Sequence, residues 1–307
     1  MTAALRIGTR GSRLALAQAE WVRQRLEAAE PGLRTELVVI KTSGDRIQDV
    51  PLHQLGGKGL FVKELEAALG EGAIDCAVHS LKDLPGELAP GLVVAAVPER
   101  EDPHDVLVGR QPGGLAALAR GARVGTSSPR RAALLRALRP DVMVVALRGN
   151  VDTRLAKLER GEVDAVLLAA AGLRRLGIRP PHAVPCDVRE FVPAIGQGAL
   201  AIESRAGEPA RRLATIEHLP SRQAIDAERA FLSAVGGSCV SPLAAHATVH
   251  ARRLALHALI ARPDGTRIVR GEADGDVVAS ARLGRELGER LLRDGGAALL
   301  RELGMAT

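Results

Sequence analysis

In the first hundred residues, short apolar runs that suit strands alternate with longer stretches whose apolar residues recur at helical spacing. Short apolar runs at residues 5–8, 35–41, 73–79 and 91–97 are typical of buried strands. Between the first two runs, a helix is expected to begin at the N-cap Ser12 and to end at Pro31-Gly32. Its expected buried residues are Leu14, Ala17, Trp21 and Val22. A second helix, from Leu60, is expected to bury Phe61, Leu65, Ala68 and Leu69.

The same alternation returns further along the chain. Strands are predicted at 123–125, 142–147 and 163–169, and helices at 128–138, 151–160 and 170–176. Strands that alternate with helices in this way indicate α/β domains with mostly parallel sheets. Residues 42–59 are polar and glycine-bearing, which is typical of a lid loop.

Two breaks and a change of pattern suggest domain boundaries. Residues 99–105 are charged and suit a linker, and residues 180–193 are proline-rich. After a helix at 222–235, alternating segments at 247–249, 254–261 and 266–272 precede a turn at 272–276 and a closing helix at 278–303. This last part predicts a small α+β domain. No internal sequence repeat is evident, although the two α/β halves are candidates for structural likeness.

Composition narrows the class of protein. The net charge is +6, and 37 of the 42 basic residues are arginines that alternate with acids. With three phenylalanines, one tryptophan and no tyrosine, the chain lacks the stacking rings of single-strand nucleic-acid binders. Codon bias is the ordinary explanation expected for most of the arginines, and a grip on carboxylate or phosphate groups is the functional one for those at the right positions. The three cysteines are far apart, which argues against disulfides and a metal site. Without an apolar leader or a long apolar run, a cytoplasmic protein that does not insert into a membrane is expected.

Polar clusters follow the predicted strands, where open α/β sheets bind ligands. The clearest is Thr126–Arg131, in which Ser128 can cap a helix and Pro129 can be its first residue. The first turn of such a helix favours an anion. Seven cations are expected to face one cleft between the α/β domains, which suits a ligand with several acidic groups: Arg10, Lys82, Arg130, Arg131, Arg148, Arg154 and Arg175.

Two residues have both a functional and an ordinary interpretation. Asp83 can protonate a leaving group or stabilise a cation, or it can simply balance Lys82 or a neighbouring arginine. Cys239 lies on a glycine-bearing turn that can present a thiol into a cleft, or it is a free loop cysteine. Cys76 is expected in the core, and His79 is expected to pack or to form a hydrogen bond.

Several motifs, in order along the chain, resemble the porphobilinogen deaminase (hydroxymethylbilane synthase) family. They are Arg6-Ile-Gly-Thr-Arg-Gly-Ser12, Gly56-Gly-Lys-Gly-Leu-Phe-Val-Lys-Glu-Leu-Glu66, His79-Ser-Leu-Lys-Asp-Leu-Pro85, Gly125-Thr-Ser-Ser-Pro-Arg-Arg131, Leu147-Arg-Gly-Asn-Val-Asp-Thr-Arg154, Pro193-Ala-Ile-Gly-Gln-Gly-Ala199 and Gly237-Ser-Cys-Val-Ser-Pro242. The resemblance covers the chain to about residue 245. Arg13, Pro129 and Ser238 depart from the family pattern without removing a chemical group.

The resemblance implies a transferase that joins four porphobilinogen molecules head to tail, with loss of ammonia, to give 1-hydroxymethylbilane. It implies a dipyrromethane cofactor held by a thioether to Cys239, and Asp83 as the catalytic acid. The matched cofactor-binding positions are Ser80, Lys82, Asp83, Thr126, Ser128, Arg130, Arg131 and Arg175. The matched substrate-binding positions are Arg10, Ser12, Arg148, Arg154 and Gln197.

The implied fold has two periplasmic-binding-protein-like domains with mixed, mostly parallel sheets, and a small α+β C-terminal domain. Residues 1–98 with 194–217 form the first domain, 104–192 the second and 222–307 the third, which carries the cofactor cysteine. A monomer that binds neither nucleic acid nor membrane is expected. The main alternative is a non-catalytic anion sensor of the same two-lobed type, which needs neither Cys239 nor Asp83. A nucleic-acid binder is a more distant alternative.

Overall fold

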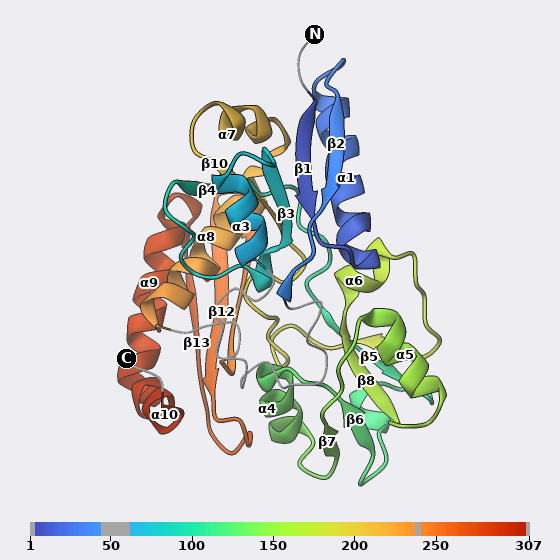
Figure 1. The fold of residues 1–307 in the computed structure, drawn as a ribbon. Helices are drawn as coiled ribbons and strands as arrows, with labels where there is room; N and C mark the ends of the chain where they lie inside the picture. Colours follow the sequence, from blue (N-terminus) through green and yellow to red (C-terminus); the bar gives the residue numbers. More distant parts are fainter. Residues whose placement is uncertain (1–3, 44–61, 237–240, 305–307) are drawn as a thin grey trace. The chain divides into compact units, whose positions relative to one another are not determined.

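The computed structural model describes residues 4–43, 62–236 and 241–304 (Figure 1). The chain forms two compact units, the first of residues 1–101 and 199–222 and the second of residues 102–198 and 223–307. Residues 44–59 of the expected lid loop, and Cys239, lie outside the described residues. The C-terminal sheet belongs to the second unit, and its status as a separate domain stays a prediction.

The first unit is built on a five-stranded sheet in the order β2-β1-β3-β10-β4. The strands are β1 (Leu5–Thr9), β2 (Thr35–Val39), β3 (Cys76–Ser80), β4 (Leu92–Ala96) and β10 (Leu200–Arg205). Strands β1, β2 and β3 are parallel, whereas β10 is antiparallel to both of its neighbours. The helices are α1 (Arg13–Ala29), α3 (Lys63–Gly70) and α7 (Glu208–Leu213). The mixed α/β class is therefore confirmed for this unit.

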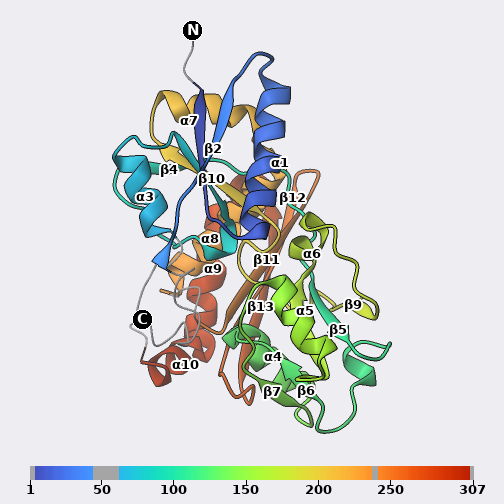
Figure 2. The same cartoon turned by 45° about the vertical axis from the view of Figure 1, so that its right-hand side comes forward.

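Helices α1 and α3 cover opposite faces of that sheet (Figures 1 and 2). Ala19, Val22 and Leu26 of α1 pack with Cys76 and Val78 of β3. Leu65 and Leu69 of α3 pack instead with Ala77, which points the other way along the strand. Cys76 is fully buried, as expected.

Helix α1 confirms its predicted start and only part of its predicted buried face. The Ser12 side chain accepts a hydrogen bond from the backbone N–H of Ala15, at 3.2 Å. The buried residues are Ala15, Gln18, Ala19, Val22 and Leu26. Of the expected inward residues, Val22 is buried and Trp21 is partly buried but packs against the same core, whereas Leu14 and Ala17 are only partly buried. The predicted face is therefore correct at its centre but displaced at its start, where Ala15 and Gln18 are buried instead of Leu14 and Ala17.

The second unit contains another five-stranded sheet, in the order β7-β6-β8-β5-β9. Its strands are β5 (Asp105–Gly109), β6 (Arg123–Gly125), β7 (Met143–Val145), β8 (Ala165–Ala169) and β9 (Ala183–Pro185). Its helices are α4 (Pro129–Leu138), α5 (Val151–Glu159) and α6 (Ala170–Arg175). Strand β5 was not expected, because its first residue is charged.

The two sheets share strand order, strand directions and register. Ile7 and Gly8 pair with Cys76 and Ala77 in one sheet, and Val124 and Gly125 pair with Ala165 and Val166 in the other. In the first sheet the antiparallel strand β10 begins with Leu200, which pairs with Ser80. In the second sheet the antiparallel strand β5 begins with Asp105, which pairs with Ala169. The paired residues of β3 and β10 therefore have equivalents in β8 and β5, although no sequence repeat is evident.

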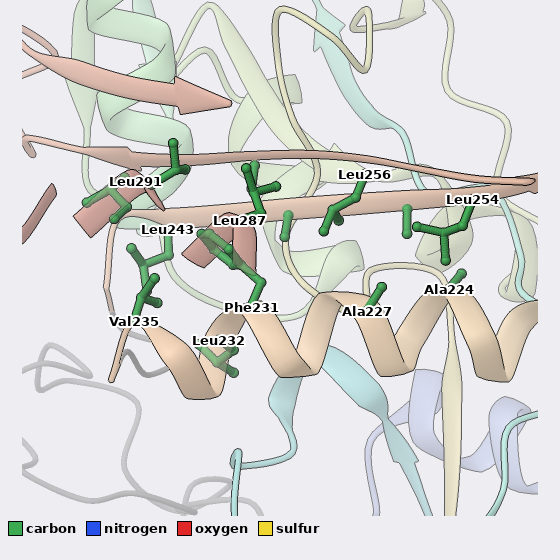
Figure 3. Close-up of a cluster of buried hydrophobic side chains, with 14 of the residues drawn as sticks. Ala224, Ala227, Phe231, Leu232, Val235, Leu243, Leu254, Leu256, Leu287 and Leu291 are labelled. Atoms are coloured by element: carbon green, nitrogen blue, oxygen red, sulfur yellow. The ribbon is translucent and has the colours of Figure 1, made fainter. Parts of the chain in front are cut away.

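The C-terminal part of the second unit is a three-stranded antiparallel sheet, β11-β12-β13, with helices α8, α9 and α10. The elements are α8 (Leu219–Ala234), β11 (Leu243–His250), β12 (Arg253–Ala261), β13 (Ile268–Asp276), α9 (Ser280–Leu291) and α10 (Ala297–Glu302). Figure 3 shows Ala227 and Phe231 of α8 and Val235 just after it, packed against leucines of β12 and α9. A Cβ on Gly284 of α9 would lie 2.0 Å from the Ala227 carbonyl oxygen, so the close approach of the two helices requires glycine there.

Two predictions for the C-terminal part were wrong. Residues 272–276 form the end of β13 rather than a turn, because the acids of this edge strand alternate toward solvent. The single closing helix is broken between α9 and α10, where Gly295 has φ 111°, a value that residues with a side chain rarely adopt.

Candidate active site

In the first unit, the predicted site residues follow β1 and β3. Arg10 and Ser12 lie between β1 and α1, and Ser80 is the last residue of β3. Lys82 and Asp83 lie on the 3₁₀ turn Leu81–Asp83 that follows directly, and both are half-buried. Because β1 and β3 are parallel neighbours, these residues gather at one edge of the sheet.

The turn that carries Asp83 is held to its own unit by backbone bonds. The N–H of Leu81 donates to the carbonyl of Ala199 at 3.0 Å, and the N–H of Leu84 donates to that of Leu81 at 3.0 Å. The hydroxyl of Ser80 accepts a bond of 2.9 Å from the Nε2 of Gln18, which is buried on α1. Strand β10 and helix α1 thus fix the segment that presents Asp83.

In the second unit, the cluster Thr126–Arg131 has the predicted local structure. Ser128 is the N-cap of α4, its side chain accepts from the N–H of Arg131, and Pro129 is the first helical residue. Thr126 is buried and its hydroxyl accepts from the N–H of Ser128 at 3.2 Å. The helix start is therefore confirmed.

Arg130 and Arg131 are buried rather than solvated, and both bind Asp105. The Nη1 of Arg130 lies 2.7 Å from Oδ2 of Asp105, and the Nε of Arg131 lies 2.7 Å from Oδ1. Arg130 also donates to the Val192 carbonyl and lies over the ring of Phe191. Burial raises the pKa of Asp105, but the charges and hydrogen bonds of the two arginines outweigh burial and hold that pKa well below its usual range.

This arrangement leaves one positive charge in excess. Two guanidiniums share a single carboxylate, and guanidiniums stay protonated in proteins. The Nε of Arg130 is buried and makes no hydrogen bond to any of the described residues. A buried positive excess with an unused N–H fits an acidic ligand group, such as a carboxylate.

The remaining predicted residues of the second unit divide into two sets. Gln197 is fully buried and donates to Asp105 at 3.2 Å and to the Pro103 carbonyl at 2.7 Å. Arg175 donates to the neighbouring Gly198 carbonyl at 2.7 Å, so it joins the same network. Arg148 lies just before α5, and Arg154 on α5 donates to the Gly149 carbonyl at 2.9 Å.

Asp105 is the charged residue at the centre of this network, and the sequence does not identify it. It was assigned to a linker, yet it is fully buried and connects Arg130, Arg131 and Gln197. The available signal was the apolar run Val-Leu-Val after it, which marks a buried strand. Among the described residues, no group of three or more His, Cys, Asp or Glu could hold a metal ion. No helix in residues 4–43, 62–236 or 241–304 is long and apolar enough to cross a membrane.

Comparison with known families decides what this site belongs to. Residues 5–212 match the model "Porphobilinogen deaminase, dipyromethane cofactor binding domain", and residues 223–293 match "Porphobilinogen deaminase, C-terminal domain". The chain belongs to the porphobilinogen deaminase family. The porphobilinogen deaminase of Pelobacter propionicus is 50% identical over 301 residues, which cover 97% of each chain. That of Roseiflexus castenholzii is 49% identical and covers 98% of this chain and 99% of its own.

Solved structures give a much weaker likeness than these relatives. The Escherichia coli aliphatic sulphonate binding protein SsuA has a TM-score of 0.37 and 20% identity, over 76% of this chain and 70% of its own. The Bacillus subtilis amino-acid transporter binding protein YtmK has a TM-score of 0.43 and 11% identity, over 69% and 89%. We conclude nothing from scores this low. The porphobilinogen deaminase assignment rests on the family models and the relatives.

Proposed function

We propose that the protein performs the porphobilinogen deaminase reaction with the residues described above. The reaction joins four porphobilinogen molecules head to tail to give 1-hydroxymethylbilane for tetrapyrrole biosynthesis. In each condensation, the C–N bond of one aminomethyl group breaks and a C–C bond to the α-carbon of another pyrrole forms. The displaced α-hydrogen leaves as a proton, and ammonia leaves with its electron pair. The observation that carries the proposal is the family match over both parts of the chain.

Asp83 is the proposed catalytic residue. Departure of ammonia leaves a substrate cation, and a carboxylate beside the pyrrole N–H stabilises that charge. The half-buried position of Asp83 on a fixed turn supports this role, because a restricted site strengthens the electrostatic effect. The same carboxylate can accept the proton that the attacking α-carbon loses.

The basic residues bind the acidic side chains of the pyrroles. Each pyrrole carries an acetate and a propionate, so the growing chain accumulates carboxylates. Arg10, Ser12, Arg148, Arg154 and Gln197 are assigned to substrate and chain. The assignment of Gln197 has the least support of these. Gln197 is fully buried, and its side chain donates to Asp105, the carboxylate that Arg130 and Arg131 share.

The dipyrromethane cofactor is assigned to Cys239 and to the site residues of both units. Ser80, Lys82, Asp83, Thr126, Ser128, Arg130, Arg131 and Arg175 are the residues that would hold it. When bound, it supplies the first pyrrole α-carbon to which substrate is joined. The buried positive excess at Arg130 and Arg131 supports this assignment, since one further carboxylate would balance it. A monomer in the cytoplasm, with three domains and no nucleic-acid partner, completes the proposal.

Intact mass of the denatured, freshly isolated protein tests the assignment. We expect a mass excess equal to one dipyrromethane, which is lost in the Cys239→Ser variant. Cys186→Ala is the matched control, because the Cys186 thiol is buried in the second unit and should leave the excess unchanged. A bare mass in active wild-type protein would contradict the covalent cofactor, and a protein without turnover would favour the anion-sensor alternative.

A further inference from the structure

A buried histidine and a buried glutamate lie close together in the first sheet, and neither is among the site residues described above. The Nε2 of His79 on β3 lies 2.9 Å from Oε2 of Glu203 on β10, and the two side chains are 3% and 0% exposed. These nitrogen and oxygen atoms do not have hydrogen-bond geometry with any described residue, so the 2.9 Å separation is a close polar contact between two buried side chains. Both residues are on the sheet face covered by α3.

A second acid faces this pair. Burial raises the pKa of Glu66 on α3; the charge of Glu203 raises it further, whereas His79 and a hydrogen bond from the N–H of Ala89 lower it. Two buried titratable groups, His79 and Glu203, and the partly buried Glu66 therefore interact on the α3 side of the sheet. Nothing in the assigned chemistry uses any of them.

The equivalent sheet of the second unit shows that the fold does not need this pair. Register places Leu168 where His79 stands and Val108 where Glu203 stands. Leu168 and Val108 are 2% and 1% exposed and belong to one apolar cluster with residues of α5 and α6. An apolar pair of similar volume thus fills the same positions of the same sheet, and buried ion pairs are often neutral or costly for stability compared with such a replacement.

The position of the pair links it to the turn that carries Asp83. His79 directly precedes Ser80, where β3 ends and the turn Leu81–Asp83 begins. The first N–H of the turn is held by Ala199, which directly precedes β10. The His79–Glu203 contact joins the same two strands, two residues before Leu81 on β3 and four residues after Ala199 on β10. It adds a side-chain contact beside the backbone pairing that both sheets share, next to the strand end from which the Asp83 turn starts.

We propose that His79 and Glu203 are positioning residues that hold the Ser80–Asp83 segment in its working geometry. The proposal rests on the proposed function, because it assumes that Asp83 acts in turnover. His79 and Glu203 do not touch the substrate in this assignment; they act through the turn. A displacement of about 1 Å at a reacting group can cost roughly 100-fold in rate, so a direct polar contact between the strands at this point has a use that an apolar pair does not supply.

The decisive experiment transplants the residues of the equivalent sheet. In H79L/E203V, we expect an unfolding midpoint equal to or above that of the wild type, with kcat for ammonia release lowered by roughly 10- to 100-fold and KM for porphobilinogen changed little. The single variants H79L and E203V each leave one buried polar partner alone and should lower the midpoint. The polar exchange H79Q/E203Q, which can bridge the strands by a hydrogen bond, should recover most of the lost kcat.

Asp75→Asn is the matched control, because Asp75 pairs with Arg6 and Arg205 beside the other end of β3. It should lower the midpoint without lowering kcat. Wild-type kcat in H79L/E203V would overturn the positioning role, and so would a midpoint as low as that of the single variants, which would make the pair a requirement of the fold. A kcat in H79Q/E203Q as low as in H79L/E203V would also overturn it. Asp83→Ala separates the two proposals. Full turnover in Asp83→Ala would contradict the role of Asp83 itself. Loss of turnover in Asp83→Ala together with full activity in H79L/E203V would contradict only the positioning role.

Discussion

The Nε of Arg131 donates to Oδ1 of Asp105 over 2.7 Å, and both side chains are buried at the start of α4. In the first unit the same three positions are apolar. Register places Leu200 at the Asp105 position, and the helix caps Ser12 and Ser128 place Leu14 and Ala15 at those of Arg130 and Arg131. The second unit therefore has three buried charges where the first has apolar residues.

Asp105→Asn should destabilise the protein strongly. Removal of this charge leaves two buried guanidiniums without a carboxylate, and breaking a buried ion pair costs about 3–5 kcal/mol. Urea unfolding measures this loss. Asp164→Asn is the control, because its ion pair with Arg123 is more than one-third exposed and contributes at most about 1 kcal/mol. Equal losses in the two variants would contradict a special role for Asp105.

The triple exchange D105L/R130L/R131A separates stability from ligand binding. It imports the apolar residues of the first unit, so we expect an unfolding free energy close to that of the wild type. The dipyrromethane mass excess should disappear, because no buried positive charge remains. A triple variant that retains the full mass excess would show that these arginines do not hold the cofactor.

The unfolding free energy should fall in acid because of Asp105. Its folded pKa lies below the ordinary value of about 4, so the unfolded chain binds the proton first as the pH falls. The stabilisation is complete above about pH 4 and is lost progressively as the pH falls toward the depressed folded value. Urea unfolding between pH 6 and pH 3 measures it. In Asp105→Asn the acid loss should be smaller, and an identical pH dependence in both proteins would assign the effect to other carboxylates.

Asp83→Ala should lower turnover by about 10²- to 10⁴-fold, the range for loss of a catalytic acid or base, while the fold survives. Ammonia release measures turnover, and thermal unfolding reports the fold. Glu87→Ala is the control, since Glu87 is an exposed acid four residues further along. Wild-type turnover in Asp83→Ala would show that its carboxylate is structural.

Cys76 and Cys186 should resist alkylation at pH 8 in the folded protein. Burial raises the pKa of each thiol to about 12, so little thiolate forms, and both side chains are buried. Iodoacetamide followed by mass analysis should modify both in urea and neither without it. Rapid labelling of Cys186 in the native state would mean that the region beside Asp105 opens readily.

Local signals predicted the parts of the fold that depend on neighbouring residues. Ser12 and Ser128 were identified as caps because a hydroxyl before a helix bonds to the first turn, whatever the rest of the chain does. Strand β6 was also placed correctly at 123–125.

Features that depend on distant partners were not predictable in the same way. Asp105 looked like a linker residue because the arginines that neutralise it come 25 and 26 positions later. The acids of β13 suggested a turn because only its pairing with β12 shows that they alternate along an edge strand. The correspondence of His79 with Leu168 is invisible in the sequence, since equivalent positions carry different chemistry.

The sheet of the first unit has a consequence for synthesis of the chain on the ribosome. Strand β4 ends at Ala96, but it is joined to β3 only through β10, which ends at Arg205. At roughly 5–20 residues per second, the apolar edge of β3 waits about 5–20 s for its neighbour. During that interval the second sheet can already close, since β5 to β9 are contiguous. The N-terminal unit is therefore expected to finish folding after the segment that follows it, the reverse of the usual order of domains during translation.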